Sequence, residues 1–206
     1  NVQQDEITAQ HIKDIQGIAY TSPLNGTYQR IVGTVTGVIP GVGYFVQDAV
    51  EAFSGIYVAD TYTFVLEGNG ITVDGTVQEV NGVTTLNADH VQLVNPPVTI
   101  TPVLMGAPAD AKSEQYESVV VKVAGARFQG SPNQDGSWEI KTTETSKEIV
   151  NKLMFEYTPV DGHYYDVTGI VNGGNNYKIE PRKAADIIDL SVTTPSVVFE
   201  DPDIMV

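Results

Sequence analysis

Short runs in which apolar and polar residues alternate occupy most of the chain, separated by turns rich in Gly, Asn and Pro. Val, Ile, Thr and Tyr dominate these runs, and alternation with a period of two between turn signals is typical of β-strands. Strands are predicted at 30–39, 44–48, 54–59, 70–80 and 83–94, and after a proline-rich joint at 95–102, at 117–128, 137–142, 163–172 and 176–181. The chain is therefore predicted to be all-β.

The two halves of the chain resemble each other. The run VDGTV at 73–77 matches VTGIV at 167–171, and each is followed by a turn and another strand. Glycine inside a strand is tolerated where the strand bends at a barrel corner or where another backbone passes close by. About five strands per half with such glycines indicate two consecutive five-stranded Greek-key barrels of the oligonucleotide/oligosaccharide-binding (OB) type.

We expect the first barrel, with its N-terminal approach segment, at 1–97 and the second at 98–190. Residues 191–206 are expected to be a linker or the start of a further module. They contain two prolines and three acids.

One segment, 145–155, supports two interpretations. Ile149 and Leu153 are four residues apart, and Thr145 with Glu148 forms a capping-box pattern, which favours a short helix. The alternative is a strand at 148–151 followed by a packed connection. The residues alone leave both open.

The charge of the chain limits its partners. The formal net charge is −15, and Lys13 and Arg30 are the two cations among the first 100 residues. Non-specific nucleic-acid binding depends on neutralisation of phosphates by Lys and Arg, so weak or no binding of DNA and RNA is expected. The chain has no cysteine, which excludes disulfides, thiolate catalysis and Cys-based zinc sites. No apolar run is long enough to predict a transmembrane helix.

Aromatic residues on the second and third strands of the first half are candidate ligand contacts. OB barrels that bind single strands stack bases on aromatic rings across these strands, beside cations that line a groove. Tyr44 and Phe45 are neighbours in one strand, so one ring points inward and the other outward; Tyr57 lies on the next strand. Asp48 and Glu51 are close and no cation is, which favours core and surface roles over binding. Tyr44 and Tyr57 are nevertheless named as candidates.

The second half supplies three further candidate contacts. Arg127 ends one predicted strand, Trp138 opens the next, and Lys141 follows Trp138. Trp138 and Lys141 are three positions apart, so they face opposite sides of the strand, and Trp138 is more typical of a core. Residues 182–183, an Arg-Lys pair close to Asp186, are interpreted as a salt-bridged edge.

No catalytic motif or metal site is predicted. The chain has no G-x-S-x-G, HExxH, P-loop or dinucleotide fingerprint. Asn133, Asp135 and Gly136 share part of a calcium-loop pattern, but the full pattern is absent and an Asp-Gly hairpin accounts for them. Calcium bound by scattered carboxylates stays open but is not predicted, and no other cofactor is expected.

A chain of motifs resembles a known family. The segments KDIQG and SPLNG within 13–26, IVGTVTGV at 31–38, GYFVQD at 43–48, SGIYV at 54–58 and GNGITVDGTVQEV at 68–80 resemble the OB-type domain of secreted bacterial nucleases. The same domain occurs in large extracellular proteins of Bacteroidetes, and the second half resembles its companion barrel. Two departures are Gly68-Asn69 in place of Gly-Asp, and a short connection at 49–53. In this resemblance SPLNG and the polar side chains of Asp14 and Gln16 tie the approach segment to the barrel rim.

These observations lead to one functional expectation and one alternative. We expect a non-catalytic interaction or scaffold module of a larger extracellular or cell-surface bacterial protein, with neighbouring domains or other surface proteins as partners. The alternative is a substrate-positioning module of an extracellular nuclease whose catalytic domain lies outside this chain. This segment itself is not expected to be an enzyme.

Overall fold

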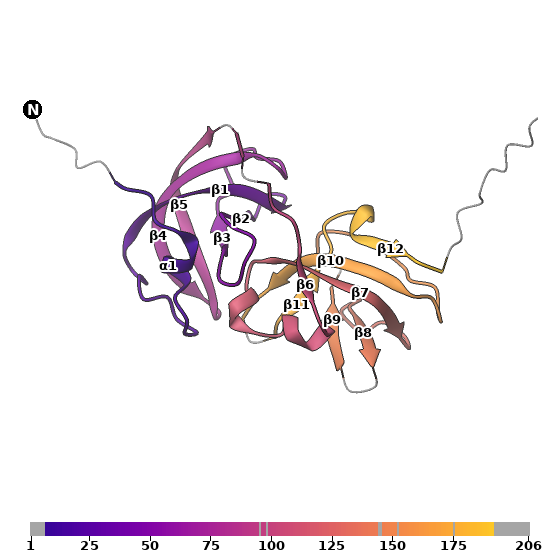
Figure 1. Ribbon diagram of the computed structural model, residues 1–206. Helices are drawn as coiled ribbons and strands as arrows, with labels where there is room; N and C mark the ends of the chain where they lie inside the picture. The colour runs from indigo at the N-terminus through magenta and orange to yellow at the C-terminus, as the bar shows by residue number, and fades with distance from the viewer. Residues whose placement is uncertain are drawn as a thin grey trace, which may run out of the picture.

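The chain folds into two lobes that lie side by side and are built almost entirely from strands (Figure 1). The structure is a computed structural model, and it describes residues 7–191 apart from 95, 98, 144, 145, 152 and 175. The all-β prediction is confirmed. We call residues 7–94 the first unit and residues 103–191 the second unit.

The first unit is a closed five-stranded barrel with the strand order β1-β2-β3-β5-β4. All neighbouring strands are antiparallel except β3 and β5, which pair in parallel. Its elements are α1 (Ile12–Gln16), β1 (Tyr28–Ile39), β2 (Gly43–Gln47), β3 (Gly55–Ala59), β4 (Gly70–Val80) and β5 (Val83–Val94). Thirteen buried side chains fill the barrel, among them Tyr44, Val46, Ile56 and Val73.

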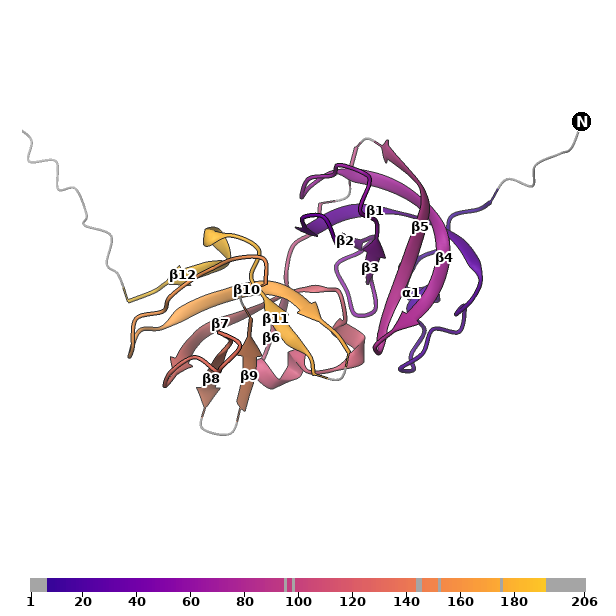
Figure 2. The ribbon, with the colours of Figure 1, turned by 180° about the vertical axis from the view of Figure 1, so that it is seen from behind.

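The second unit is a seven-stranded sheet with the order β12-β10-β11-β9-β8-β7-β6, in which β10 also pairs with β7. Five of its strands, β7, β8, β9, β11 and β10, therefore follow one another in a ring of pairings, with β9 and β11 parallel. Its elements are β6 (Val103–Met105), η1 (Pro108–Ala111), η2 (Glu114–Tyr116), β7 (Val120–Gln129), β8 (Trp138–Thr143), β9 (Ser146–Val150), β10 (Tyr165–Asn172), β11 (Lys178–Glu180), η3 (Ala184–Asp186) and β12 (Ile187–Asp189). The rear view shows β10 running across the middle of this lobe (Figure 2).

Glycines sit where strands of the two units approach their neighbours most closely. A Cβ atom at Gly75 in β4 would overlap the backbone oxygen of Asn87 in β5. A Cβ atom at Gly169 in β10 would likewise overlap the backbone of Glu180 in β11. Close approach of another backbone, one of the two reasons expected for glycine inside these strands, is thus confirmed at both positions.

The approach segment ends in a short helix that closes one end of the barrel. Ile12 and Ile15 of α1 are fully buried in the barrel core. The Gln16 side chain donates a 2.5 Å hydrogen bond from Nε2 to the backbone oxygen of Gly55, while Ser22 donates from its hydroxyl to the backbone oxygen of Ile15. The predicted tie to the barrel is confirmed for Gln16, whereas Asp14 is exposed.

Residues 145 and 152 of the segment 145–155 lie outside the described residues; in the rest, the helix interpretation is wrong, and a strand is present, at 146–150 rather than at the expected 148–151. Residues 146–150 form β9, which pairs with β8 on one side and with β11 on the other. The backbone nitrogen of Asn151 also donates to the backbone oxygen of Ile179 at 2.8 Å. The long-range pairings of this segment outweigh the local four-residue spacing, because they close the ring of strands.

Candidate functional site at the junction of the two units

The outward face of β2 and β3 is covered by the second unit. Phe45 is 2% exposed and packs with Val120 of β7 and Ile170 of β10. The ring of Tyr57 lies 5.1 Å from that of Phe45, centroid to centroid, and joins the same cluster. Next to them, the backbone nitrogen of Val120 donates to Oε1 of the buried Gln47 at 2.7 Å. All five residues of β2 are buried, since one face fills the barrel and the other meets the second unit.

This junction determines where the first two candidate contacts lie. Tyr44 points into the barrel, is 1% exposed, and donates from its hydroxyl to Asp60 at 3.3 Å. Burial, with the charge of Asp60, raises the pKa of the Tyr44 hydroxyl above its usual range. The outward ring of the pair is Phe45, as alternation allows, but Phe45 and Tyr57 stack on the second unit. Tyr44 is buried and Tyr57 is partly buried at the junction, and the role of both residues in ligand binding stays a prediction.

The other three candidates are divided between the core and the surface of the second unit. Trp138 is half-buried and meets Phe128 edge to face, with ring centroids 6.0 Å apart. Arg127 and Lys141 are direct partners in the β7–β8 ladder, and the Arg127 guanidinium lies 5.3 Å above the Tyr164 ring. The structure therefore brings Arg127 and Lys141 together and separates both from Trp138; the strand spacing had indicated this separation for Lys141.

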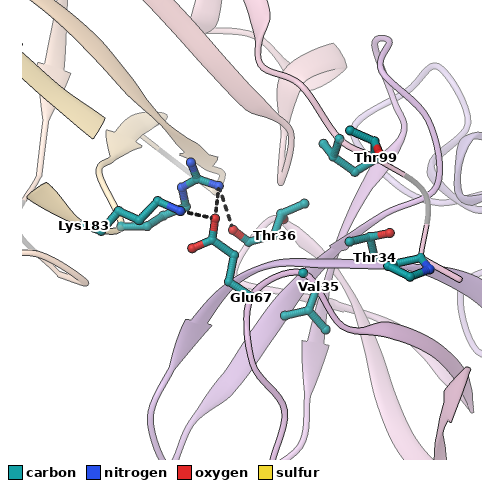
Figure 3. A pocket seen from close by; sticks show the side chains of 10 residues that line it. Thr34, Val35, Thr36, Glu67, Thr99 and Lys183 are labelled. Atoms are coloured by element: carbon teal, nitrogen blue, oxygen red, sulfur yellow. Dashed lines mark hydrogen bonds and ion pairs between the residues drawn. The ribbon is translucent and has the colours of Figure 1, made fainter. Parts of the chain in front are cut away.

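Three charged residues link the units at a second place on the junction. Oε1 of Glu67, from the β3–β4 connection, accepts from Lys183 Nζ at 2.6 Å and lies 3.2 Å from Arg182 Nη1. Arg182 also donates to the backbone oxygen of Thr36 in β1 at 2.9 Å, and its Nε and Nη2 bind Asp186 at 2.7 and 2.8 Å. The predicted salt-bridged edge at 182–183 is confirmed, and it faces the first unit (Figure 3).

Two hollows meet at this ion cluster, which we call the Glu67–Arg182–Lys183 cluster. One, with a volume of about 390 Å³, lies between β1 and the connection around Pro97 and is lined also by Thr34, Thr36 and Thr99 (Figure 3). The other, of about 470 Å³, lies between the β1–β2 turn and the β3–β4 connection. Both volumes fall in the range of small-ligand sites.

The buried carboxyl group of Glu117 forms a third link between the units. Glu117, just before β7, is fully buried, and its Oε1 accepts from the backbone nitrogen of Thr84 in β5 at 2.8 Å. Its Oε2 is buried without a hydrogen-bond partner among the described residues. Burial, together with the charges of Glu114 and Glu79, raises the pKa of Glu117 to about 8. A carboxyl group that holds its proton near neutral pH thus lies inside the junction.

The turn at 133–137 is a hairpin connection, as preferred from the sequence. Oδ1 of Asp135 accepts from the backbone nitrogen and hydroxyl of Ser137 at 3.0 and 2.6 Å, and Oδ2 lies 2.7 Å from Lys178 Nζ. In the part of the chain that the structure describes, no group of three or more His, Asp or Glu side chains is arranged to hold a metal ion. No helix in that part is both long and apolar enough to cross a membrane.

Sequence reasoning missed the residues that line the larger hollow. Tyr62, Phe64 and Glu67 lie in a connection between predicted strands, where no periodic pattern marks a role. The run TYTF at 61–64 could have indicated a surface site. Two aromatic residues in a short loop with charged neighbours are not expected to pack in a core, and exposed aromatic residues often mark a binding surface.

Comparisons with known proteins leave the family unassigned. No protein-family model matches the chain. No curated protein matches its sequence to a significant degree.

Proposed function

We propose that this chain is a non-catalytic interaction and spacer module in which two OB-like barrels are held in one fixed orientation. The parent protein is proposed to be extracellular or attached to a bacterial cell surface, as the resemblance to secreted nuclease-associated domains implies. The observation that carries the proposal is the junction, where a face of the first barrel is closed by the second unit.

The strand order supports the fold part of the proposal. Both units follow the cycle first-second-third-fifth-fourth strand, and in both the third and fifth strands of the cycle are parallel. The runs matched between the halves, 73–77 and 167–171, lie in β4 and β10, which hold the same place in the two cycles. This agreement supports a tandem repeat of one barrel type with extra strands β6 and β12 on the second.

The closed face supports an interaction role over nucleic-acid positioning. OB barrels commonly bind oligonucleotides on the face of strands two and three. In the first unit that face carries Phe45 and Tyr57 and is packed against the second unit. The alternative, a substrate-positioning module of a nuclease, is favoured by one feature, the exposed Arg127 beside Lys141 on the outer side of β7 and β8.

A distance measurement tests the fixed orientation. The chain has no cysteine, so spin labels attach specifically to Asp89→Cys on β5 and Thr142→Cys on β8, both at exposed positions. Pulsed electron paramagnetic resonance should give a single narrow distance distribution. Phe45→Ala, which removes the central ring of the junction, should broaden it. A broad distribution in the labelled chain that still carries Phe45 would refute the spacer proposal.

A further inference from the structure

At one place on the junction, a carboxyl group rather than an ion pair joins the two units. Glu117 of the second unit is fully buried, and its Oε1 accepts from the backbone nitrogen of Thr84 in the first unit at 2.8 Å. Close by, a Cβ atom added to Gly174 would lie 3.0 Å from the backbone oxygen of Asn81. The β4–β5 turn and the β10–β11 connection therefore meet beside Glu117, and we call this place the Glu117 contact.

The second oxygen of Glu117 lies in a space that suits the neutral acid better than the carboxylate. The backbone nitrogen of Gly174 also acts on the carboxyl group, but Oε2 itself is buried without a hydrogen-bond partner among the described residues. A Cβ atom added to Gly173 would overlap Oε2, so this oxygen lies directly against the backbone of the β10–β11 connection. Burial of a charged oxygen without donors is costly, whereas burial of a protonated carboxyl group is tolerated.

The groups that face Glu117 from the surrounding elements add negative charge. Glu79 at the end of β4 belongs to the first unit and Glu114 of η2 to the second, and among the described residues these are the charges that act on Glu117. Tyr177, after the β10–β11 connection, donates to Glu114, and Tyr20 lies close enough to interact with Tyr177. Burial, together with Glu114, raises the pKa of the Tyr177 hydroxyl above its usual range, so this group stays neutral. An ionised Glu117 would thus be repelled by charges on both units.

Strained backbone lies on both sides of the same contact. Phe53 of the first unit and Ser118 of the second have φ angles of 62° and 61°, in the left-handed region that residues other than glycine rarely adopt. The backbone nitrogen of Phe53 donates to the backbone oxygen of Gln115 at 2.6 Å, and a Cβ atom at Gly55 would overlap the backbone of Ser118. Such conformations persist only where the surroundings hold them, so separation of the units here would release strain.

We propose that the Glu117 contact is a proton-operated hinge, at which the two units swing apart when Glu117 loses its proton. The inference deepens the proposed spacer function and rests on it, because a fixed orientation must exist before the loss of a proton can release it. Ionisation brings three negative charges together in a buried place, whereas opening lets water solvate them. The Glu67–Arg182–Lys183 cluster joins opposite charges at a separate place on the junction and serves as the pivot.

The direction of the pH dependence follows from the position of Glu117. Burial, followed by the charges of Glu114 and Glu79, raises the pKa of Glu117 from 4.5 to about 8 in the closed arrangement. The closed arrangement therefore keeps a proton that the open one releases between these values. The ratio of closed to open molecules falls as the pH rises across this interval and levels off above about pH 8. Acid thus locks the spacer and alkali releases it.

The test measures the distance between the units in the whole chain at about pH 5 and about pH 9. Spin labels are attached through thioether bonds to Asp89→Cys and Thr142→Cys, and pulsed electron paramagnetic resonance gives the distance distribution. The labelled parent chain should give a narrow distribution at the lower pH and a broader one, shifted to longer distances, at the higher pH. The labelled Glu117→Gln chain, whose amide resembles the neutral acid, should stay narrow at both. Glu51→Gln is the control and should behave as the parent chain does.

A second measurement on the parent chain alone keeps the test independent of how the Glu117→Gln chain folds. The side-chain carboxyl carbon of Glu117, followed by nuclear magnetic resonance, should titrate over the same pH interval as the distance distribution. Near-ultraviolet circular dichroism should show that both units stay folded at the higher pH.

The outcomes separate the hinge from the spacer function. A parent chain that stays narrow at both pH values would overturn the hinge and leave the spacer proposal standing, whereas a broad distribution already at the lower pH would refute both. The hinge is also overturned if Glu117→Gln broadens as the parent chain does, or if Glu117 titrates outside the interval of opening. Loss of the near-ultraviolet signal at the higher pH would overturn it too, since the units would then unfold rather than separate.

Discussion

Glu117 shows how a single side chain can make the junction depend on pH. Its carboxyl group is fully buried, and Glu79 and Glu114 add negative charge around it, while the Tyr177 hydroxyl donates to Glu114 at 2.5 Å. Its pKa is raised from 4.5 to about 8. The folded chain therefore keeps a proton that the unfolded chain releases across that interval, and the free energy of unfolding must fall as the pH rises through it.

Glu117→Gln removes this titration. When the pH is raised from about 5 to about 9, the free energy of unfolding of the parent chain should fall by about 2 kcal/mol more than that of the variant. Urea unfolding at the two pH values measures the difference. Glu51→Gln, at a half-exposed position, is the control and should keep the slope of the parent chain. A Glu117→Gln slope identical to that of the parent would show that Glu117 is ionised throughout.

The placement of individual residues was predictable from the sequence only as far as local periodicity reaches. Alternation correctly indicated that Tyr44 and Phe45 point to opposite sides of β2. It could not show that Phe45 is covered, because the covering residues come from the other half of the chain; Gln47 and its partner Val120 are 73 positions apart. The same holds for Glu67, whose cations are more than a hundred residues away along the chain.

At the scale of elements, the strands were predictable and the exceptions have identifiable causes. The predicted β4 and β5 have the bounds found in the structure, because turn residues delimit both. The short strands β6 and β12 were missed, since three residues carry too little pattern. The segment that became β9 was ambiguous because its pairing partners, β8 and β11, decide its conformation.

The helix α1 was also missed, and its role in the barrel can be measured. Ile15 is fully buried in the core of the first unit. Ile15→Ala should lower the free energy of unfolding by about 3 kcal/mol, as expected for a cavity in a packed core. Ile18→Ala, two residues beyond the helix at a position 89% exposed, is the matched control and should change it by less than about 0.5 kcal/mol. Equal effects of the two substitutions would mean that α1 does not close the barrel.

At the scale of the whole molecule, the net charge of −15 governs encounters with polyanions. A fluorescently labelled single-stranded oligonucleotide should show no saturable change in anisotropy at micromolar protein and physiological salt. The exposed Arg127 beside Lys141 is the place to examine if binding appears. Micromolar, salt-sensitive binding that Arg127→Ala abolishes would favour the nuclease-associated alternative over the spacer function.

The two-sided burial of β2 has a consequence for anyone who wishes to express half of this protein. Cutting the chain in the joint at 95–102 would leave Phe45, Ile39 and Tyr57 facing water on the first fragment and Val120 and Ile170 facing water on the second. Each fragment would expose a hydrophobic patch that the intact chain buries, and each would tend to aggregate. Shortened versions for crystallisation or display should therefore keep the pair intact, or replace these five side chains with hydrophilic ones.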